Sequence, residues 1–109
     1  MTDSGLALDK DGYLVHLEDW SRDVAQVLAD GHHIQLAAEH WEVLDCLRQF
    51  YADTQVSPAM RPFVKLVKTS LGEDKGNSIY LMQLFGYDGQ SPAKIAAKLA
   101  GLPRPTNCL

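Results

Sequence analysis

The sequence predicts an α+β domain in which a small N-terminal β-hairpin or meander packs on an array of about five helices, followed by an extended C-terminal arm. Three observations lead to this fold class. Two short apolar stretches flank the turn sequence DKDG, apolar residues then recur at helical spacing between capping signals, and two prolines follow the last helix. We expect residues 1–101 to form a single domain and residues 102–109 to form the arm.

The hairpin and the first helix come from the N-terminal third of the chain. Residues 6–8 and 13–17 are the apolar stretches, and Gly12 between them suits a turn that requires a positive φ. A helix then follows Ser21, which is a good N-cap residue, and ends before Gly31.

The strongest helical pattern is the segment AAEHWEVLDCLRQFY, residues 37–51. Large apolar side chains recur along one stripe of this helix: Trp41, Leu44, Leu47 and Tyr51. A third helix ends near Leu71 and starts at Pro58, with Ser57 as its N-cap, or at Arg61.

Two shorter helices complete the array. The first runs from Asn77 or Ser78 to Phe85 and is closed by Gly86. The second starts with the Ser-Pro pair of SPAKIAAKLAG and stops at Gly101. Because Pro103 and Pro105 follow that stop, we expect the remaining residues to leave the domain as an extended arm.

Length and composition indicate one globular domain. The chain has 109 residues, of which 46% are hydrophobic and 22% are charged, an ordinary balance for a folded protein. No apolar run approaches the roughly 20 residues that span a bilayer, and the acidic N-terminus does not resemble a signal peptide. We therefore expect a cytoplasmic protein that does not bind membranes.

Charge is distributed unevenly along the chain. Residues 1–57 contain eleven acidic residues and three Lys or Arg, whereas residues 58–109 contain seven Lys or Arg and three acidic residues. A basic half of this kind suits an acidic partner or RNA phosphates, but charge alone favours a solvated helical surface.

Two cysteines have different expected roles. Cys46 lies on the flank of the strongest helix, where a free cysteine acts as a small hydrophobic residue. Cys108 lies on the proline-stiffened arm, which can reach roughly 20 Å from Leu102. A thiol there is either part of an inactive tail or a nucleophile presented to another protein.

Two other kinds of site have weak signals. The adjacent His32 and His33 have no acidic or thiol residue placed to complete a metal site, so we expect no metal. The helices around residues 37–51 and 61–71 have the order of a helix-turn-helix, with basic Lys65 and Lys68 on the second helix. The first of these helices is acidic and suits a phosphate backbone poorly, so we expect no direct DNA binding.

Several stretches of this chain resemble the sulfur-relay family of DsrC and TusE proteins. The matching stretches are GYL, EHWEV, SPAMR, LVK, GNSIYLMQLF and, most specifically, KLAGLPRPTNCL, which combines a helix stop, a proline arm and a cysteine one residue before the last. The resemblance runs from about Gly12 to Leu109. It implies the fold expected above, a small β-meander against a helical array.

The resemblance also implies a chemistry. The two-cysteine members of the family carry a second thiol at the position of Ala97, so this chain resembles the single-cysteine, TusE-like branch. That branch implies a sulfurtransferase whose Cys108 becomes a persulfide intermediate. Its sulfur would come from a TusBCD-type complex and pass to an MnmA-type tRNA 2-thiouridylase for 2-thiolation of the wobble uridine, without a cofactor or metal.

Arg104, Lys94 and Lys98 are the cations nearest to Cys108 in the sequence. We expect them to support its thiolate or to dock an acidic surface of a partner. Two alternatives remain open at this point: a DsrC-like carrier in sulfur oxidation, and a non-catalytic nucleic-acid-binding helix-turn-helix module.

Overall fold

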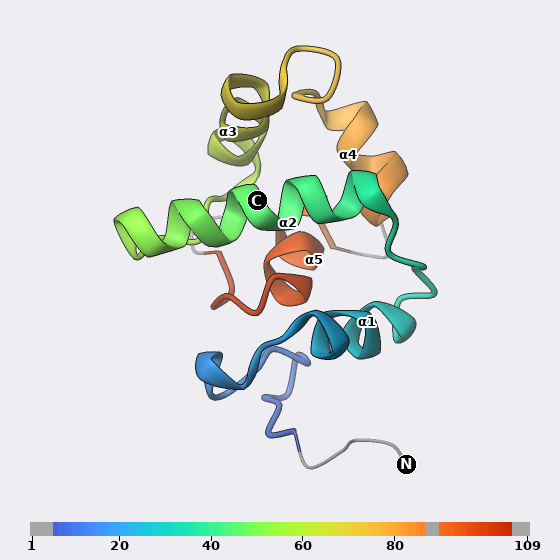
Figure 1. The fold of residues 1–109 in the computed structure, drawn as a ribbon, viewed down its shortest axis with the longest axis vertical. Helices are drawn as coiled ribbons and strands as arrows, with labels where there is room; N and C mark the ends of the chain where they lie inside the picture. Colours follow the sequence, from blue (N-terminus) through green and yellow to red (C-terminus); the bar gives the residue numbers. More distant parts are fainter. Residues whose placement is uncertain (1–5, 87–89, 106–109) are drawn as a thin grey trace.

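The computed structural model describes residues 6–86 and 90–105 of the chain. These residues form five α-helices after one short 3-10 helix, and α5 lies in the middle of the array with α1 on one side and α2 across the other (Figure 1). The elements are η1 Leu17–Asp19, α1 Arg22–Asp30, α2 Ala38–Thr54, α3 Met60–Leu71, α4 Ser78–Phe85 and α5 Pro92–Leu99. The five helices lie where the sequence predicts them.

Three helix starts follow the predicted capping chemistry. The side chain of Ser21 accepts a hydrogen bond from the backbone N–H of Val24 at 3.2 Å, and Asn77 caps α4 through Tyr80 N–H at 2.8 Å. Ser91 caps α5, whose first residue is a proline. These side chains satisfy backbone donors that a helix leaves unpaired in its first turn.

Helix α3 begins later than one of the two predicted starts. Its N-cap is Ala59 and its first residue is Met60, so Ser57 and Pro58 precede it. Pro62 is therefore the third helical residue. Its missing N–H is one that the first turn leaves unpaired in any helix, which explains why this proline is tolerated.

The predicted α+β fold with an N-terminal β-hairpin is wrong, because residues 6–86 and 90–105 contain no β-strand. A turn with Gly12 at φ +89° is present, but pairing is limited to one isolated bridge between Leu8 and Leu14. The Asp9 side chain accepts the N–H of Tyr13 at 3.0 Å, which takes that donor away from a strand ladder. After Val15 the chain turns into η1, so the pairing cannot extend.

The core of the molecule surrounds α5. This helix contacts α1, α2, α3 and α4, and every residue of it except Lys94 is buried. The largest fully buried side chains from the other helices are Phe63, Phe85, Leu44, Leu47 and Leu81. Because α5 is fixed on all sides, its C-terminal end is a rigid base for the segment that follows.

Candidate functional site

The C-terminal end of α5 is closed by a tight turn from which the predicted arm begins. Leu102 N–H donates to the Ala97 carbonyl at 2.9 Å and Gly101 N–H donates to the Lys98 carbonyl at 3.1 Å. This pair of hydrogen bonds is a Schellman motif, with Gly101 at φ +76° in the left-handed conformation that the motif requires. The helix stop that the sequence predicts at Gly101 is therefore confirmed.

Two side chains from distant segments satisfy the last carbonyls of α5. The indole N–H of Trp20 donates to the Leu99 carbonyl at 2.8 Å, and the Arg48 guanidinium donates to the Ala100 carbonyl at 2.7 Å. The Arg48 guanidinium also stacks 3.8 Å from the centre of the Trp20 ring. Partial burial lowers the pKa of Arg48, and the charge of Asp45 opposes that shift, so the side chain remains a cation at the negative end of the helix.

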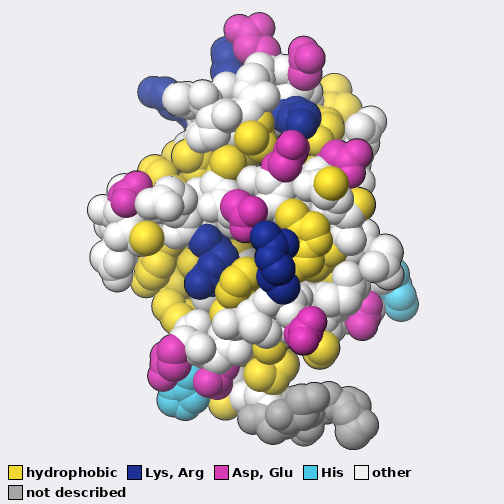
Figure 2. Space-filling model, in the orientation of Figure 1, with side chains coloured by type: hydrophobic (Ala, Val, Ile, Leu, Met, Phe, Trp, Pro, Cys, Tyr) yellow, Lys and Arg dark blue, Asp and Glu magenta, His cyan; other side chains and the backbone are white. Residues whose placement is uncertain are grey.

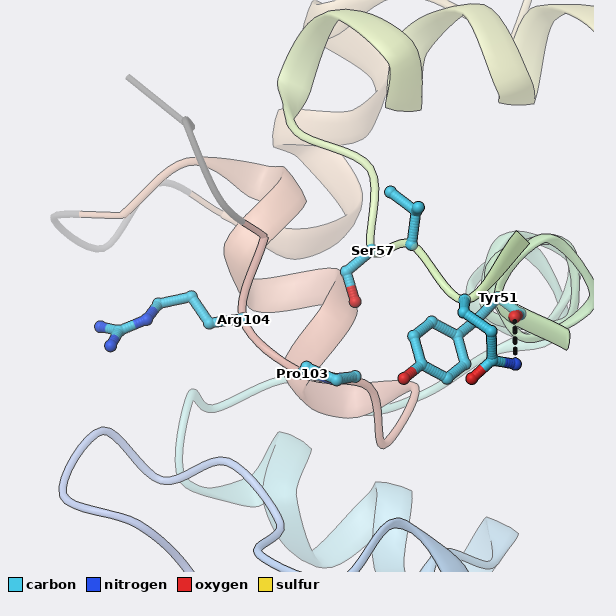
Figure 3. A pocket seen from close by; sticks show the side chains of 6 residues that line it. Tyr51, Ser57, Pro103 and Arg104 are labelled. Atoms are coloured by element: carbon cyan, nitrogen blue, oxygen red, sulfur yellow. Dashed lines mark hydrogen bonds between the residues drawn. The ribbon is translucent and has the colours of Figure 1, made fainter.

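Residues 102–105, the root of the arm, lie against the domain. Leu102 is 3% exposed and Pro105 is buried, whereas Pro103 and Arg104 are exposed. Figure 3 shows Pro103 beside Tyr51 and Ser57, with the Arg104 side chain directed away from them. These residues line a pocket of about 180 Å³ on the α2–α3 side of the root.

On its other side, the root contacts the N-terminal turn. Arg104 forms an ion pair with Asp11 at 2.7 Å, across 93 positions of the sequence. Asp9 organises this turn by accepting the N–H groups of Asp11 and Tyr13. Slight burial raises the pKa of Asp9, but these two hydrogen bonds and the charge of Arg104 outweigh it, and the net shift of the pKa is downward.

Basic side chains from three segments meet beside the root. Lys10, Lys94 and Arg104 line one pocket of about 420 Å³, together with Asp11, Tyr13 and Gln90. The net charge of these lining residues is positive even with Arg104 paired to Asp11. The structure thus brings together two of the three predicted supporting cations, Arg104 and Lys94, and adds Lys10.

Lys98 is separated from this group although it lies one turn after Lys94. It is 7% exposed, its ammonium group lies 3.1 Å from the Nε2 of His32, and it lies 5.4 Å from the centre of the Tyr13 ring. Lys98 is therefore a buried, hydrogen-bonded residue of the domain. Cys108, the predicted nucleophile, lies outside the described residues.

Cys46 is in a position that suits a packing residue. Its side chain lies on α2 with intermediate exposure and is unpaired with another cysteine among the described residues. Burial raises the pKa of its thiol, the nearby carboxylates of Asp45 and Glu42 raise it further, and a hydrogen bond from Ser70 only partly offsets this. A raised pKa leaves little thiolate at neutral pH, which makes Cys46 a poor nucleophile.

The described part of the chain contains neither a metal-ligand cluster nor a membrane-spanning helix. Residues 6–86 and 90–105 contain no group of three or more His, Cys, Asp or Glu residues that could hold a metal ion. None of the helices found there is long and apolar enough to cross a membrane. On the face shown in Figure 2, acidic side chains are scattered among the basic ones, and that face has no continuous basic surface for nucleic acid.

The whole chain matches a known family. Residues 1–109 match the family model described as "DsrC like protein". The chain belongs to the DsrC-like family. This confirms the family resemblance that the sequence motifs indicate.

Relatives and solved structures agree with this assignment. A "Sulfurtransferase TusE homolog" of Haemophilus influenzae is 50% identical over 93% of this chain and 90% of its own length. "Sulfurtransferase TusE" of Escherichia coli K12 is 46% identical over the same shares of the two chains. The NMR structure of Allochromatium vinosum DsrC matches with a TM-score of 0.84 at 45% identity, over 95% of this chain and 90% of that one.

Sequence reasoning missed Trp20 and Arg48 as residues that hold the C-terminal end of α5, from which the root continues. Arg48 did carry a signal. It lies seven residues after Trp41 and three before Tyr51, so a cation occupies the apolar stripe of α2. An arginine in such a position needs buried acceptors, and the end of α5 supplies one.

Proposed function

We propose that this DsrC-like protein is a sulfur-relay carrier that accepts persulfide sulfur on Cys108 and passes it on for 2-thiolation of the tRNA wobble uridine. The observation that carries the proposal is the match over 93–95% of the chain to proteins named sulfurtransferase TusE. The geometry of the root supports it, because a reactive group at the end of an arm benefits from a base that is already ordered.

The chemistry needs only thiols. The Cys108 thiolate attacks the terminal sulfur of a donor cysteine persulfide, the new S–S bond forms, and the donor cysteine leaves as a thiolate. The transferred sulfur keeps its proton, and no electrons enter or leave the pair. Attack by an acceptor thiolate on the terminal sulfur of the Cys108 persulfide repeats the step and regenerates Cys108. No cofactor or metal takes part.

The partners follow from the same proposal. Sulfur arrives from a TusBCD-type complex and is delivered to an MnmA-type thiouridylase that holds tRNA. Ala97 lies buried in α5 where two-cysteine relatives are expected to carry a second thiol, so the proposed mechanism uses one thiol on the arm. The relay operates in the cytoplasm, where thiols stay reduced.

Arg104 and Lys94 are the supporting cations in this proposal. Both line the pocket beside the root, where they can dock an acidic donor surface or stabilise a thiolate. The buried Lys98 is assigned to the domain instead. Arg104→Met and Lys94→Met are expected to slow sulfur acceptance from a protein donor, whereas Arg61→Met on α3 serves as an exposed control. Equal rates in all three variants would remove this role.

Intact-mass spectrometry tests the carrier function. The wild type, Cys108→Ser and Cys46→Ser are each incubated with a cysteine desulfurase, cysteine and the upstream relay proteins, then digested. We expect one added sulfur on the C-terminal peptide of the wild type and of Cys46→Ser, and none in Cys108→Ser. Absence of sulfur from Cys108 with a competent donor would refute the proposal.

A second arm of the experiment tests the destination. Loaded protein is mixed with the thiouridylase and tRNA, and 2-thiouridine is measured in the digested tRNA. Sulfur that loads on Cys108 but never reaches tRNA would redirect the proposal to sulfur oxidation. The helix-turn-helix alternative predicts the opposite pattern: salt-dependent nucleic-acid binding that is lost on neutralising Lys65 and Lys68 and is indifferent to Cys108.

A further inference from the structure

The last three carbonyl groups of α5 and that of its C-cap, Ala100, need partners from outside the helix. A helix leaves these four groups without intrahelical partners, and here they lie next to fully buried residues. The Schellman turn satisfies those of Ala97 and Lys98. Trp20 and Arg48 satisfy those of Leu99 and Ala100, so the end of the helix is completely paired only when both side chains are in place.

Trp20 also limits where the chain can go after the helix. A Cβ atom placed on Gly101 would lie 2.3 Å from Cδ1 of the Trp20 ring, so the backbone of the turn is pressed directly against the indole. Arg48 stacks on the same ring and thereby holds it in place. The turn, the indole and the guanidinium form one packed unit at the point where the arm begins.

The root, residues 102–105, is also held in a fixed conformation after this turn. Leu102 is buried, prolines fix φ at positions 103 and 105, and Arg104 is paired with Asp11. Few backbone torsions are therefore free between the end of α5 and Pro105, and Cys108 lies three residues further along the sequence.

We propose that Trp20 and Arg48 are positioning residues for sulfur transfer: by holding the end of α5 they set the direction in which the arm presents Cys108 to protein partners. This inference rests on the proposed carrier function. Its physical basis is the rate advantage of holding a reactive group in a narrow range of orientations. Neither residue touches the transferred sulfur in this account, so neither is catalytic.

Three variants perturb the unit in different ways. Arg48→Met removes the donor and the charge while keeping the length of the side chain, and Arg48→Lys keeps a charge and a donor. Trp20→Phe keeps an aromatic face and removes the indole donor. The matched control is Arg22→Met, because Arg22 also stacks on a tryptophan, 4.3 Å from the centre of the Trp41 ring, and forms its ion pair with Asp45 of α2.

Arm orientation is measured directly and without a partner protein. In a Cys46→Ser background, nitroxide labels are attached to Cys108 and to Val27→Cys, an exposed position on α1, and the distance distribution is recorded by pulsed EPR. We expect Arg48→Met and Trp20→Phe to broaden or shift the distribution, Arg48→Lys to recover part of the wild-type form, and Arg22→Met to leave it unchanged. A helix cap that affected stability alone would not move this readout in folded protein.

Sulfur loading of the unlabelled proteins then separates presentation from thiol reactivity. With glutathione persulfide as a small donor, we expect all variants to load Cys108 within about twofold of the wild-type rate. With the protein donor, we expect Arg48→Met and Trp20→Phe to load about tenfold more slowly. An unchanged EPR distribution, an unchanged protein-donor rate, or equal losses with both donors would each overturn the positioning role.

Failure of the carrier function has a different signature. If wild-type Cys108 loads from neither donor, the proposed function is wrong. The positioning role in sulfur transfer then falls with it, while the EPR distances still report whether Trp20 and Arg48 orient the arm.

Discussion

Gly101→Ala tests whether the end of α5 is as tightly packed as the structure shows. The added Cβ would lie 2.3, 2.6 and 2.8 Å from Cδ1, Cγ and Cβ of Trp20, distances at which something must shift. The left-handed conformation costs an L-residue about 1–2 kcal/mol, and overpacking adds about 1–3 kcal/mol. We therefore expect the free energy of unfolding to fall by about 2–5 kcal/mol, a large part of the roughly 5–15 kcal/mol available to a domain.

Urea unfolding followed by circular dichroism measures this change, and a second background isolates the clash. Trp20→Ala removes the two ring atoms nearest the new methyl group but leaves the backbone strain at position 101. In that background Gly101→Ala is expected to cost about 1–2 kcal/mol less than in the wild type. Equal costs in the two backgrounds would refute the steric argument and leave backbone strain as the whole effect.

Three further predictions concern the titratable groups. Lys98→Met should lower the free energy of unfolding by about 1–3 kcal/mol, because the buried hydrogen bond between Lys98 and His32 is lost. Lys94→Met should change the free energy of unfolding by less than about 0.5 kcal/mol, and urea titrations of the two variants compare them. Because burial raises the pKa of Cys46, the folded state favours its neutral thiol. The free energy of unfolding should therefore fall as pH rises above about 8.5. Cys46→Ala should weaken that decline between about pH 8 and pH 10. The pKa of Asp9 is lowered in the folded protein, so its ionised carboxylate adds to the free energy of unfolding above about pH 4, and this contribution is lost as pH falls further. The NMR chemical shift of its carboxyl carbon should therefore titrate at a lower pH than in a model peptide. In Arg104→Met the same carbon should titrate at a higher pH than in the wild type.

The helices could be predicted from the sequence because their signals are local. Ser21, Asn77 and Ser91 each cap the helix that follows within three residues, and the apolar stripe of α2 identifies its buried face. The Ser57–Pro58 start was two residues early for α3. The sequence offered two possible starts for this helix, Pro58 and Arg61. The observed start at Met60 places Pro62 in the first turn, where a proline is tolerated.

The hairpin failed because strand formation depends on pairing that extends beyond the turn. The DKDG turn forms, but the Asp9 carboxylate takes the N–H of Tyr13 that a ladder would use, and η1 begins two residues after Val15. The apolar stretch after the turn reflects burial of Tyr13 and Leu14 in the core instead. An apolar stretch of so few residues does not distinguish a strand from such a buried turn.

The site was predictable only in part, for a related reason. The helix stop at Gly101 is a local feature that the sequence predicts correctly, whereas the role of Cys108 stays a prediction from the family motif. The contacts of Trp20 and Arg48 with α5 span 79 and 52 positions, and the Arg104–Asp11 ion pair spans 93. Helical spacing places Lys94 and Lys98 on one face, yet tertiary packing leaves one beside the root and buries the other.

A carrier that moves sulfur between two other proteins has no need for a substrate cleft of its own, because each transfer joins only two thiols. What its fold can contribute is the position of the arm. In this molecule that contribution starts from α5, the helix with neighbours on all sides, and passes through an end whose carbonyls are paired by side chains from two other segments. In the proposed relay, activation of the Cys108 thiolate can be supplied by the partner's pocket at the moment of transfer, and a thiolate that forms only then is less open to oxidation. In the proposed relay, the short segment between α5 and Cys108 limits how much orientation is lost before the thiol, because fewer residues between two points leave fewer free torsions.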